Sequence, residues 1–210
     1  REGRWLLTQE TSRIGLFVRA PEFDRERDLT WLGQNWGGFL SQDGRTLAFV
    51  EGAPAMGPNY GVCVRGTDGS PVLRLGEGNL TDCSRDGKWT LAVVSGPLPV
   101  LVAYPVGPGD PVRFDRGSIE SYAHAQWFRD GSRVLVNAAE PGKGMRYYIQ
   151  DLKGGLPRPI TPEGIRDGQL APDERSLLAR GPTGAYAIYP IDGGEPRPVT
   201  GLSENDALLR

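Results

Sequence analysis

The sequence predicts an all-β chain folded as a β-propeller with four-stranded antiparallel blades. The first observation is a repeat, in which an acidic residue opens a turn at intervals of 43, 44 and 43 residues, at Asp43-Gly44, Asp86-Gly87, Asp130-Gly131 and Asp173-Glu174. The second observation is that an apolar run follows each turn, while no stretch has the period of an amphipathic helix. A fixed period in the forties made of short strands is the signature of a β-propeller.

Each repeat is expected to hold four strands. The first strand runs into the acidic turn, and the second is apolar throughout, as in residues 47–50 and 134–136. A blade packs against a neighbour on either side, so both faces of its second strand are buried. The third strand carries aromatic and β-branched residues, as in 147–149. The fourth is short, and its proline (Pro159 or Pro198) fits an outer edge strand with no further ladder partner.

The repeats predict a single domain of five blades, with boundaries at residues 1–32 plus 205–210, 36–76, 79–115, 119–161 and 165–201. Glu2-Gly3, 41 residues before Asp43, opens the turn of a first repeat that lacks its first strand, so that Asp173 belongs to the fifth repeat. Residues 205–210 align with the missing strand. The length of 210 residues divided by five is 42, which matches the period. We therefore expect the C-terminal strand to close the first blade by pairing with residues 5–7, which removes an open sheet edge. The alternative is a piece of a six- or seven-bladed propeller.

The composition argues against several partner classes. With 24 Lys and Arg against 26 Asp and Glu, the net charge is -2, so there is no global electrostatic reason to bind nucleic acid or an anionic membrane. No apolar run approaches the length of a membrane span, so we expect no membrane insertion. Gly 30 and Pro 18 suit many tight turns between short strands.

The two cysteines, Cys63 and Cys83, are too few for a disulfide scaffold. We expect two small buried residues in neighbouring blades. A single bridge in an oxidising compartment is the alternative. No CxxC motif or paired histidine accompanies them, so neither a metal site nor a cofactor is expected.

A ligand is expected at one mouth of the central channel, where the loops that enter the first strands lie. Seven residues before the turn acid stand Trp36, Asn79, Ala123, Arg166 and, across the closure, Asn205, and six before it stand Gly37, Leu80, His124, Asp167 and Asp206. The candidate ligand-binding residues are Trp36, Asn79, Tyr122, His124, Arg166, Asp167, Asn205 and Asp206.

Each candidate at the mouth also has a structural interpretation. The single histidine, His124, is more often a hydrogen-bonded structural residue than a catalyst. Asp167 and Asp206 could form a carboxylate pair or bind a cation, but solvated turn carboxylates are the simpler interpretation, because a divalent cation wants more oxygen ligands than these loops offer. Trp36 is either an aromatic anchor for a peptide or sugar, or packing between blades.

The residues around the turns resemble a known repeat. Residues 41–49 and 84–88, together with the closing hairpin at 151–161, resemble the TolB-type β-propeller repeat, which is related to the WD-repeat. Residues 25–32 further resemble the propellers appended to some bacterial serine/threonine protein kinases. That resemblance implies an extracytoplasmic or regulatory binding module attached to a signalling enzyme, although this chain contains no kinase motif. The fifth repeat departs from the pattern, because Glu174 replaces the turn glycine and leaves the geometry of that turn open.

Together these features predict a non-catalytic propeller that binds a protein, a peptide or a small ligand at its channel mouth, as a sensor or interaction domain of a larger bacterial signalling protein. One alternative is a glycoside-processing propeller enzyme, which needs two channel carboxylates roughly 5–9 Å apart. Its candidate acids are Asp82, Glu120, Asp167 and Asp206. A second alternative is an inactive fragment of a larger propeller.

Overall fold

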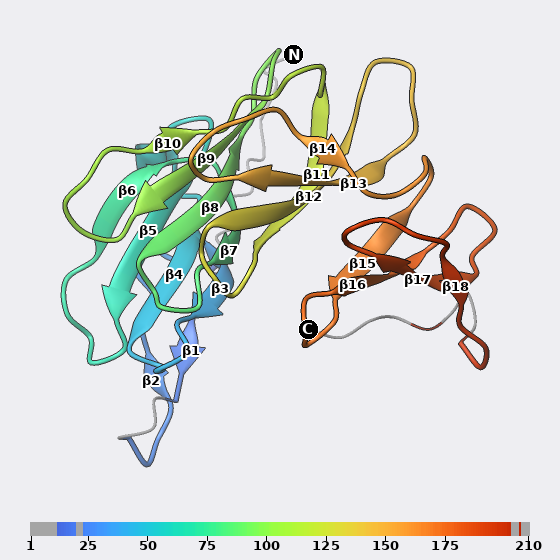
Figure 1. Cartoon of the computed structure of the whole chain (residues 1–210). Helices are drawn as coiled ribbons and strands as arrows, with labels where there is room; N and C mark the ends of the chain where they lie inside the picture. Colours follow the sequence, from blue (N-terminus) through green and yellow to red (C-terminus); the bar gives the residue numbers. More distant parts are fainter. Residues whose placement is uncertain (1–11, 20–22, 203–205, 207–210) are drawn as a thin grey trace, which may run out of the picture.

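The computed structural model describes residues 12–19, 23–202 and 206 (Figure 1). This part of the chain consists of short antiparallel strands, and its one helical element is the 3-10 turn Pro54–Met56. Four sheets have four strands each, and a fifth sheet has two. The predicted all-β fold with four-stranded antiparallel blades is therefore confirmed.

The strands follow one another along the chain as a meander. The two-stranded sheet pairs β1 (Phe17–Val18) with β2 (Arg27–Asp28). The first strands of the four complete blades are β3 (Asn35–Leu40), β7 (Asn79–Cys83), β11 (Ser121–Trp127) and β15 (Arg166–Leu170). The second strands are β4 (Thr46–Glu51), β8 (Trp89–Val94), β12 (Arg133–Ala139) and β16 (Ser176–Arg180). The third strands are β5 (Gly61–Gly66), β9 (Val100–Pro105), β13 (Arg146–Asp151) and β17 (Tyr186–Pro190), and the fourth are β6 (Leu73–Glu77), β10 (Val112–Arg113), β14 (Arg158–Pro159) and β18 (Arg197–Pro198).

Each complete blade keeps its strands in chain order, so its first strand lies at one edge of the sheet. Strand β7 contacts both β3 and β11, so the first strands of neighbouring blades lie beside one another at the inner edge. The fourth strands lie at the outer edge, where Pro159 and Pro198 are exposed. This arrangement gives every first strand two distinct ends, one where the chain enters it and one where it runs into the acidic turn.

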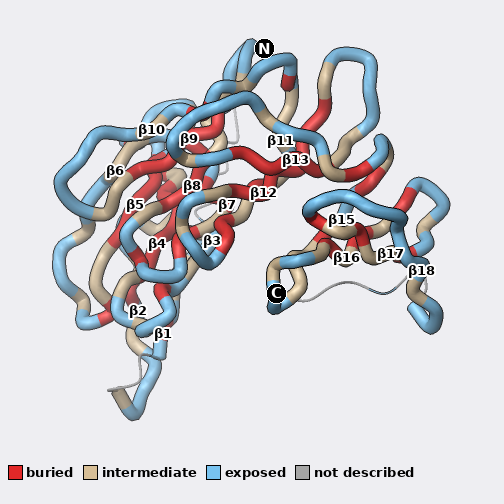
Figure 2. Tube along the Cα trace, viewed as in Figure 1, coloured by how far each residue is buried: buried red, intermediate tan, exposed pale blue. Residues whose placement is uncertain are grey.

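The core consists of apolar clusters between consecutive sheets. Leu29 and Phe49 belong to the cluster between β1–β2 and the β3–β6 blade. The other three clusters join β3–β6 to β7–β10, β7–β10 to β11–β14, and β11–β14 to β15–β18. Figure 2 shows the buried stretches along the strands and the exposed ones along the loops. Each blade is therefore stabilised by the blades next to it in the sequence.

Burial of the second strands follows the position of the blade. Five consecutive residues of β4 and six of β12 are buried, as expected for strands covered on both faces. Strand β16 alternates instead: Leu177 and Ala179 are buried against the preceding blade, whereas Leu178 is half-buried. Within the described ranges, the β15–β18 blade shares an apolar cluster with the β11–β14 blade alone.

The predicted closure between residues 205–210 and 5–7 lies outside the described residues, except for Asp206. The carbonyl oxygen of Asp206 accepts a hydrogen bond from Tyr186 Oη at 2.6 Å, which places this residue against β17.

The acidic turns share one geometry. Each turn carboxylate accepts the backbone N–H two residues later, at 3.0 Å for Asp43, 3.1 Å for Asp86, 2.8 Å for Asp130 and 3.0 Å for Asp173. The next residue adopts a left-handed conformation in every case, with φ values of 69°, 70° and 64° at the three glycines and 57° at Glu174. The fifth turn therefore keeps the common geometry, although a side chain in this conformation costs about 1–2 kcal/mol.

Both cysteines are free and buried, as predicted. Cys63 lies on β5 in the cluster against β1–β2, and Cys83 lies on β7 in the next cluster along the chain. Burial raises the pKa of each thiol to about 12.

The turn glycines allow a matched test of blade packing. Gly87 and Gly131 have nearly the same φ, but a Cβ at Gly87 would lie 2.9 Å from Ser41 Cβ in the neighbouring blade, whereas one at Gly131 would meet nothing within 4 Å. We expect Gly131→Ala to lower the free energy of unfolding by about 1–2 kcal/mol through backbone strain. Gly87→Ala should cost about 1–3 kcal/mol more through overpacking. Urea unfolding measures both changes, and equal losses would contradict the inter-blade contact.

The buried thiols predict a loss of stability in alkali. In the unfolded chain a cysteine titrates near its ordinary pKa of 9, whereas in the fold the pKa is about 12. Deprotonation therefore favours the unfolded chain, and stability should be full below pH 9 and fall as the pH rises toward 12. Urea midpoints at pH 8, 9 and 10 measure the slope. The double variant Cys63→Ala/Cys83→Ala should flatten it, and an unchanged slope would assign the loss to other groups.

Candidate functional site

Four of the predicted residues lie at one level of the inner edge. Trp36, Asn79, His124 and Arg166 sit on β3, β7, β11 and β15. Each pairs with the residue seven positions after its turn acid, namely Val50, Val93, Asn137 and Arg180. The sequence alignment had assigned this level to Ala123, which is wrong. In β3, β7 and β15 the register shift lies between this level and the acidic turn, whereas in β11 it lies before the level, between Tyr122 and His124. The level therefore falls at His124, one residue nearer the turn acid.

Trp36 combines packing with partial exposure. Its half-buried ring packs on the cluster between the β3–β6 and β7–β10 blades. The ring also covers Gly52, where a Cβ would lie 2.3 Å from it. Tyr60, from the β4–β5 loop, meets the indole edge to face with ring centroids 5.0 Å apart. The structure therefore gives Trp36 a scaffold role and places it at the rim of the loops that enter the first strands.

Tyr122 and His124 are half-buried on either side of the bulge. The Tyr122 hydroxyl is buried, and no group in the described ranges forms a hydrogen bond with it. Burial raises the pKa of Tyr122 to about 12. This side chain is therefore a neutral, packed phenol over the physiological range.

Two of the polar candidates, Arg166 and Asp167, are engaged in ion pairs. Asp167 is in the bulge of β15 with a φ of 51°, and its carboxylate pairs with the guanidinium of Arg180 and lies 3.9 Å from Arg166 Nε. Asn79 is exposed. Asp206 contacts Tyr186 through its carbonyl oxygen, and Asn205 lies outside the described residues.

The carboxylates proposed for an enzyme are spread over several blades. Asp82 is on β7, Glu120 directly precedes β11, and Asp167 is on β15. Asp82 Oδ2 accepts the backbone N–H of Trp127 at 2.7 Å, and Asp82 Oδ1 accepts the backbone N–H of Cys83 at 2.8 Å. In the part of the chain that the structure describes, no three His, Cys, Asp or Glu side chains are grouped so that they could hold a metal ion.

A first cavity lies where the chain enters β3. It has a volume of about 410 Å³ and is lined by Ser12, Arg13, Trp31, Leu32, Gly33, Gln34, Ala53 and Pro54. We call it the entry cavity. Its main apolar side chains, Trp31 and Leu32, are 38% and 47% exposed.

A buried carboxylate holds the entry cavity in place. Glu51 is fully buried, and its oxygens accept hydrogen bonds from the Leu32 and Ala53 backbone N–H groups, both at 2.9 Å, and from Asn35 Nδ2 at 2.5 Å. The Asn35 side-chain oxygen accepts the Trp31 N–H at 2.8 Å. The backbone at Trp31 and Leu32 is therefore fixed by hydrogen bonds to two buried side chains, while the side chains of Trp31 and Leu32 are exposed.

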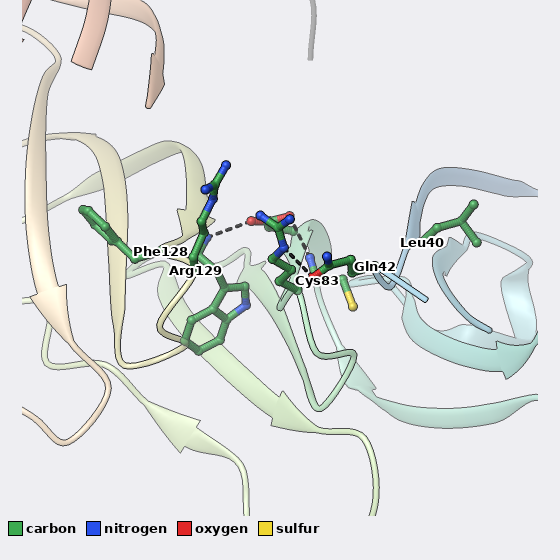
Figure 3. A pocket seen from close by; sticks show the side chains of 8 residues that line it. Leu40, Gln42, Cys83, Phe128 and Arg129 are labelled. Atoms are coloured by element: carbon green, nitrogen blue, oxygen red, sulfur yellow. Dashed lines mark hydrogen bonds between the residues drawn. The ribbon is translucent and has the colours of Figure 1, made fainter. Parts of the chain in front are cut away.

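A second hollow lies at the opposite ends of the first strands, next to the acidic turns. One cavity of about 360 Å³ is lined by Leu40, Gln42, Asp82, Cys83, Arg85, Trp127, Phe128 and Arg129. In Figure 3, Leu40 and Gln42 lie on one side of it and Phe128 and Arg129 on the other. A neighbouring cavity of about 320 Å³ shares Asp82, Trp127 and Arg129 with it and extends to the β15–β16 turn. We call the two together the turn groove.

Hydrogen bonds between blades build the turn groove. Arg85 and Gln42 are joined twice, by the Gln42 N–H to the Arg85 carbonyl at 3.0 Å and by Arg85 Nε to Gln42 Oε1 at 2.5 Å. Asp82 binds the Trp127 N–H, as described above. Glu174 Oε1 accepts the Arg129 N–H at 2.7 Å. Each bond joins two consecutive blades, so the groove is a feature of the assembled blades.

Solved structures with the same fold support this architecture. TolB from Acinetobacter baumannii aligns with a TM-score of 0.64 and 18% identity, over 90% of this chain and 52% of that chain. The chain has the fold of the TolB-type β-propellers. A putative TolB from Agrobacterium tumefaciens aligns with a TM-score of 0.62 and 14% identity, over 76% of this chain and 62% of that one. An oligogalacturonate lyase from Vibrio parahaemolyticus aligns with a TM-score of 0.62 and 15% identity, over 83% and 55%.

The TolB-type likeness concerns the fold, and it extends over part of those proteins. The chain spans between 52% and 62% of the length of the three structures named above. No protein-family model matches the sequence, and no curated protein does so either. No helix within the described ranges is long and apolar enough to span a membrane.

Sequence reasoning found the inner-edge level of this propeller but missed both cavities. The predicted boundaries placed Trp31 and Leu32 at the end of the first blade without a binding role, and of the residues lining the turn groove only Asp82 was a candidate, as an acid of the enzymatic alternative. One signal for the entry cavity was available: Asn35 and Glu51 are polar residues at the two paired ends of apolar strands. The bonds of the turn groove join residues 43 to 45 positions apart and carry no local signal.

Tyr122 provides a test of the inner edge. Because its buried hydroxyl has no partner in the described structure, Tyr122→Phe removes a desolvated polar group and no bond. We expect the free energy of unfolding to stay unchanged or to rise by about 1 kcal/mol. Tyr186→Phe is the matched control, since it deletes a hydroxyl that donates to Asp206, and it should cost about 1 kcal/mol. Equal losses in the two variants would show that the Tyr122 hydroxyl has a partner in solution.

Proposed function

We propose that this chain is a non-catalytic propeller module that binds an extended peptide segment of a protein partner at the entry cavity. The observation that carries the proposal is the exposed pair Trp31 and Leu32, held beside a cavity of about 410 Å³ by the buried bonds of Glu51 and Asn35. Aromatic anchors on a fixed backbone are typical of binding hot spots. Preorganisation lowers the entropy lost on binding.

The predicted channel-mouth residues would extend this surface. Trp36 lies on β3, and Tyr60, which is exposed, lies in the β4–β5 loop that also contributes Ala53 and Pro54 to the entry cavity. His124, Asn79, Arg166 and Asp167 would supply polar contacts further along the inner edge, with Tyr122 as packing. Asn205 and Asp206 belong to this proposal only as sequence candidates.

A sensor role in a larger signalling protein is part of the proposal. It is supported by the resemblance of residues 25–32 to propellers appended to bacterial kinases, and this segment contains both Trp31 and Leu32. The likeness to TolB structures is compatible with a protein-binding module. An extracytoplasmic location would follow from the same resemblance.

The proposal can be tested without knowing the partner. Peptides selected from a random phage-displayed library on the immobilised chain should lose affinity by at least about tenfold in Trp31→Ala, as is typical of a hot-spot truncation. Leu32→Ala should act in the same direction. Leu156→Ala removes a more exposed apolar side chain from the β13–β14 hairpin, and it should leave binding unchanged. If the selected peptides bind Trp31→Ala as well as the parent chain, the entry cavity is not the site.

The enzymatic alternative has its own readout. Some structures with this fold are oligogalacturonate lyases, one of them determined in complex with manganese. We expect no turnover of oligogalacturonate by the purified chain, with or without manganese. Turnover that is lost in His124→Ala or Asp167→Asn would overturn the non-catalytic proposal.

A further inference from the structure

We infer that the turn groove is a second binding site and that it takes an acidic peptide. The groove lies at the ends of the first strands opposite to the entry cavity, so this inference goes beyond the proposed function. Three observations support it: the carboxylates of the groove accept backbone N–H groups, the guanidinium groups of Arg85 and Arg129 have no carboxylate partner among the described residues, and the indole N–H of Trp127 is buried without an acceptor there.

The carboxylates of the groove are committed to its walls. Asp82 accepts the backbone N–H groups of Trp127 and Cys83, and Glu174 accepts that of Arg129. The bonds to Trp127 and Arg129 join blades, and the negative charges are held in the scaffold by amide donors. A carboxylate that already accepts such bonds offers less to a cationic ligand.

The guanidinium groups of the groove, those of Arg85 and Arg129, have no carboxylate partner within the described ranges. Arg85 uses Nε on Gln42 Oε1, a neutral acceptor, and Arg129 enters the groove wall through its backbone N–H alone. Both residues are exposed, and neither forms an ion pair within the described ranges. By contrast, Arg133, Arg146 and Arg180 each have a carboxylate partner. The groove therefore presents two arginine forks, which match the geometry of carboxylates.

Trp127 gives an independent indication of a ligand. This residue lines both cavities of the groove and is only 7% exposed. Its indole N–H is buried, and no acceptor for it exists in the described part of the structure. A buried donor without an acceptor is rare in native proteins and costs free energy. An oxygen acceptor brought by a ligand, with a small shift of the ring, would remove that cost.

The shape and the remaining lining favour a peptide over a small ion. The two cavities share Asp82, Trp127 and Arg129, so the groove crosses from the β3–β6 blade to the β15–β18 blade. Leu40, which is 49% exposed, and Leu170 and Pro172 add apolar surface along it. The complementary ligand is an extended segment in which carboxylates alternate with apolar side chains.

Fluorescence anisotropy with labelled peptides tests the inference. The probe is a fluorescein-labelled peptide of alternating glutamate and leucine, and the matched probe has glutamine in place of glutamate. We expect the acidic peptide to bind and the glutamine peptide to bind at least about tenfold more weakly, because the ligand's charge-assisted bonds are lost. Added salt should weaken the acidic peptide's binding.

Variants of the chain locate the binding. Arg85→Ala/Arg129→Ala should weaken the acidic peptide by at least about tenfold. Arg158→Ala/Arg197→Ala, which removes the same charge from the exposed outer strands β14 and β18, should leave binding unchanged. Trp127→Phe keeps an aromatic, though smaller, ring and removes the indole N–H donor, and it should weaken binding severalfold. Thermal melting of each variant checks that it is folded.

Three outcomes would overturn the inference: equal binding of both probes, unchanged binding in Arg85→Ala/Arg129→Ala, or displacement of the peptide by inorganic phosphate at comparable concentration. Trp31→Ala should leave the acidic peptide's affinity unchanged. The two proposals can therefore be refuted separately. Binding of the phage-selected peptides to Trp31→Ala tests only the entry cavity, and binding of the acidic peptide to Arg85→Ala/Arg129→Ala tests only the turn groove.

Discussion

The packing of each sheet against the next is the constraint on which the rest of the structure depends. A four-stranded blade whose second and third strands are apolar on both faces cannot bury them alone, and two-stranded or isolated sheets are marginal in water. The four apolar clusters between consecutive sheets supply that burial. Strands β12 and β16 show this dependence: β12 has six consecutive buried residues, whereas buried and half-buried residues alternate in β16. Among the described residues, burial follows the number of neighbouring sheets more than the composition of the strand.

The packing of consecutive sheets also explains why the two proposed binding surfaces lie at the ends of the first strands. A first strand is hydrogen-bonded on one side only, so its inner edge tolerates irregularity that a central strand would not. All four first strands of the complete blades contain a register shift near their middle. In β11 the shift lies on the entry side of His124, which places this residue level with Trp36 although it stands one residue nearer its turn acid. The two ends of these strands are therefore set by the scaffold while their side chains vary from blade to blade.

The sequence was sufficient for what is local and repeated. The Asp-Gly turns, the four strands per repeat and the buried free cysteines all follow from short patterns, and even Glu174 keeps the left-handed turn because the rest of its hairpin dictates it. The position of His124 along β11 could not be predicted, because an alignment of the repeats on the turn acid does not show on which side of a residue the β-bulge lies. The turn groove could not be predicted either, because Asp82 and Trp127 meet only after two blades have stacked.

The two proposed surfaces are built by the same kind of hydrogen bond, but one of them is apolar and the other is positively charged. In both, a carboxylate accepts backbone N–H groups and fixes a loop, which satisfies donors that would otherwise be buried and unpaired. At the entry cavity the carboxylate, Glu51, is fully buried and draws in the polar groups of Asn35 and Leu32, so that what remains outside is the apolar pair Trp31 and Leu32. At the turn groove the carboxylates of Asp82 and Glu174 are bound by amides at the rim, so that what remains outside is the positive charge of Arg85 and Arg129. The chemistry of each surface is therefore set by the groups that the scaffold leaves over, and a ligand suited to one surface is poorly suited to the other.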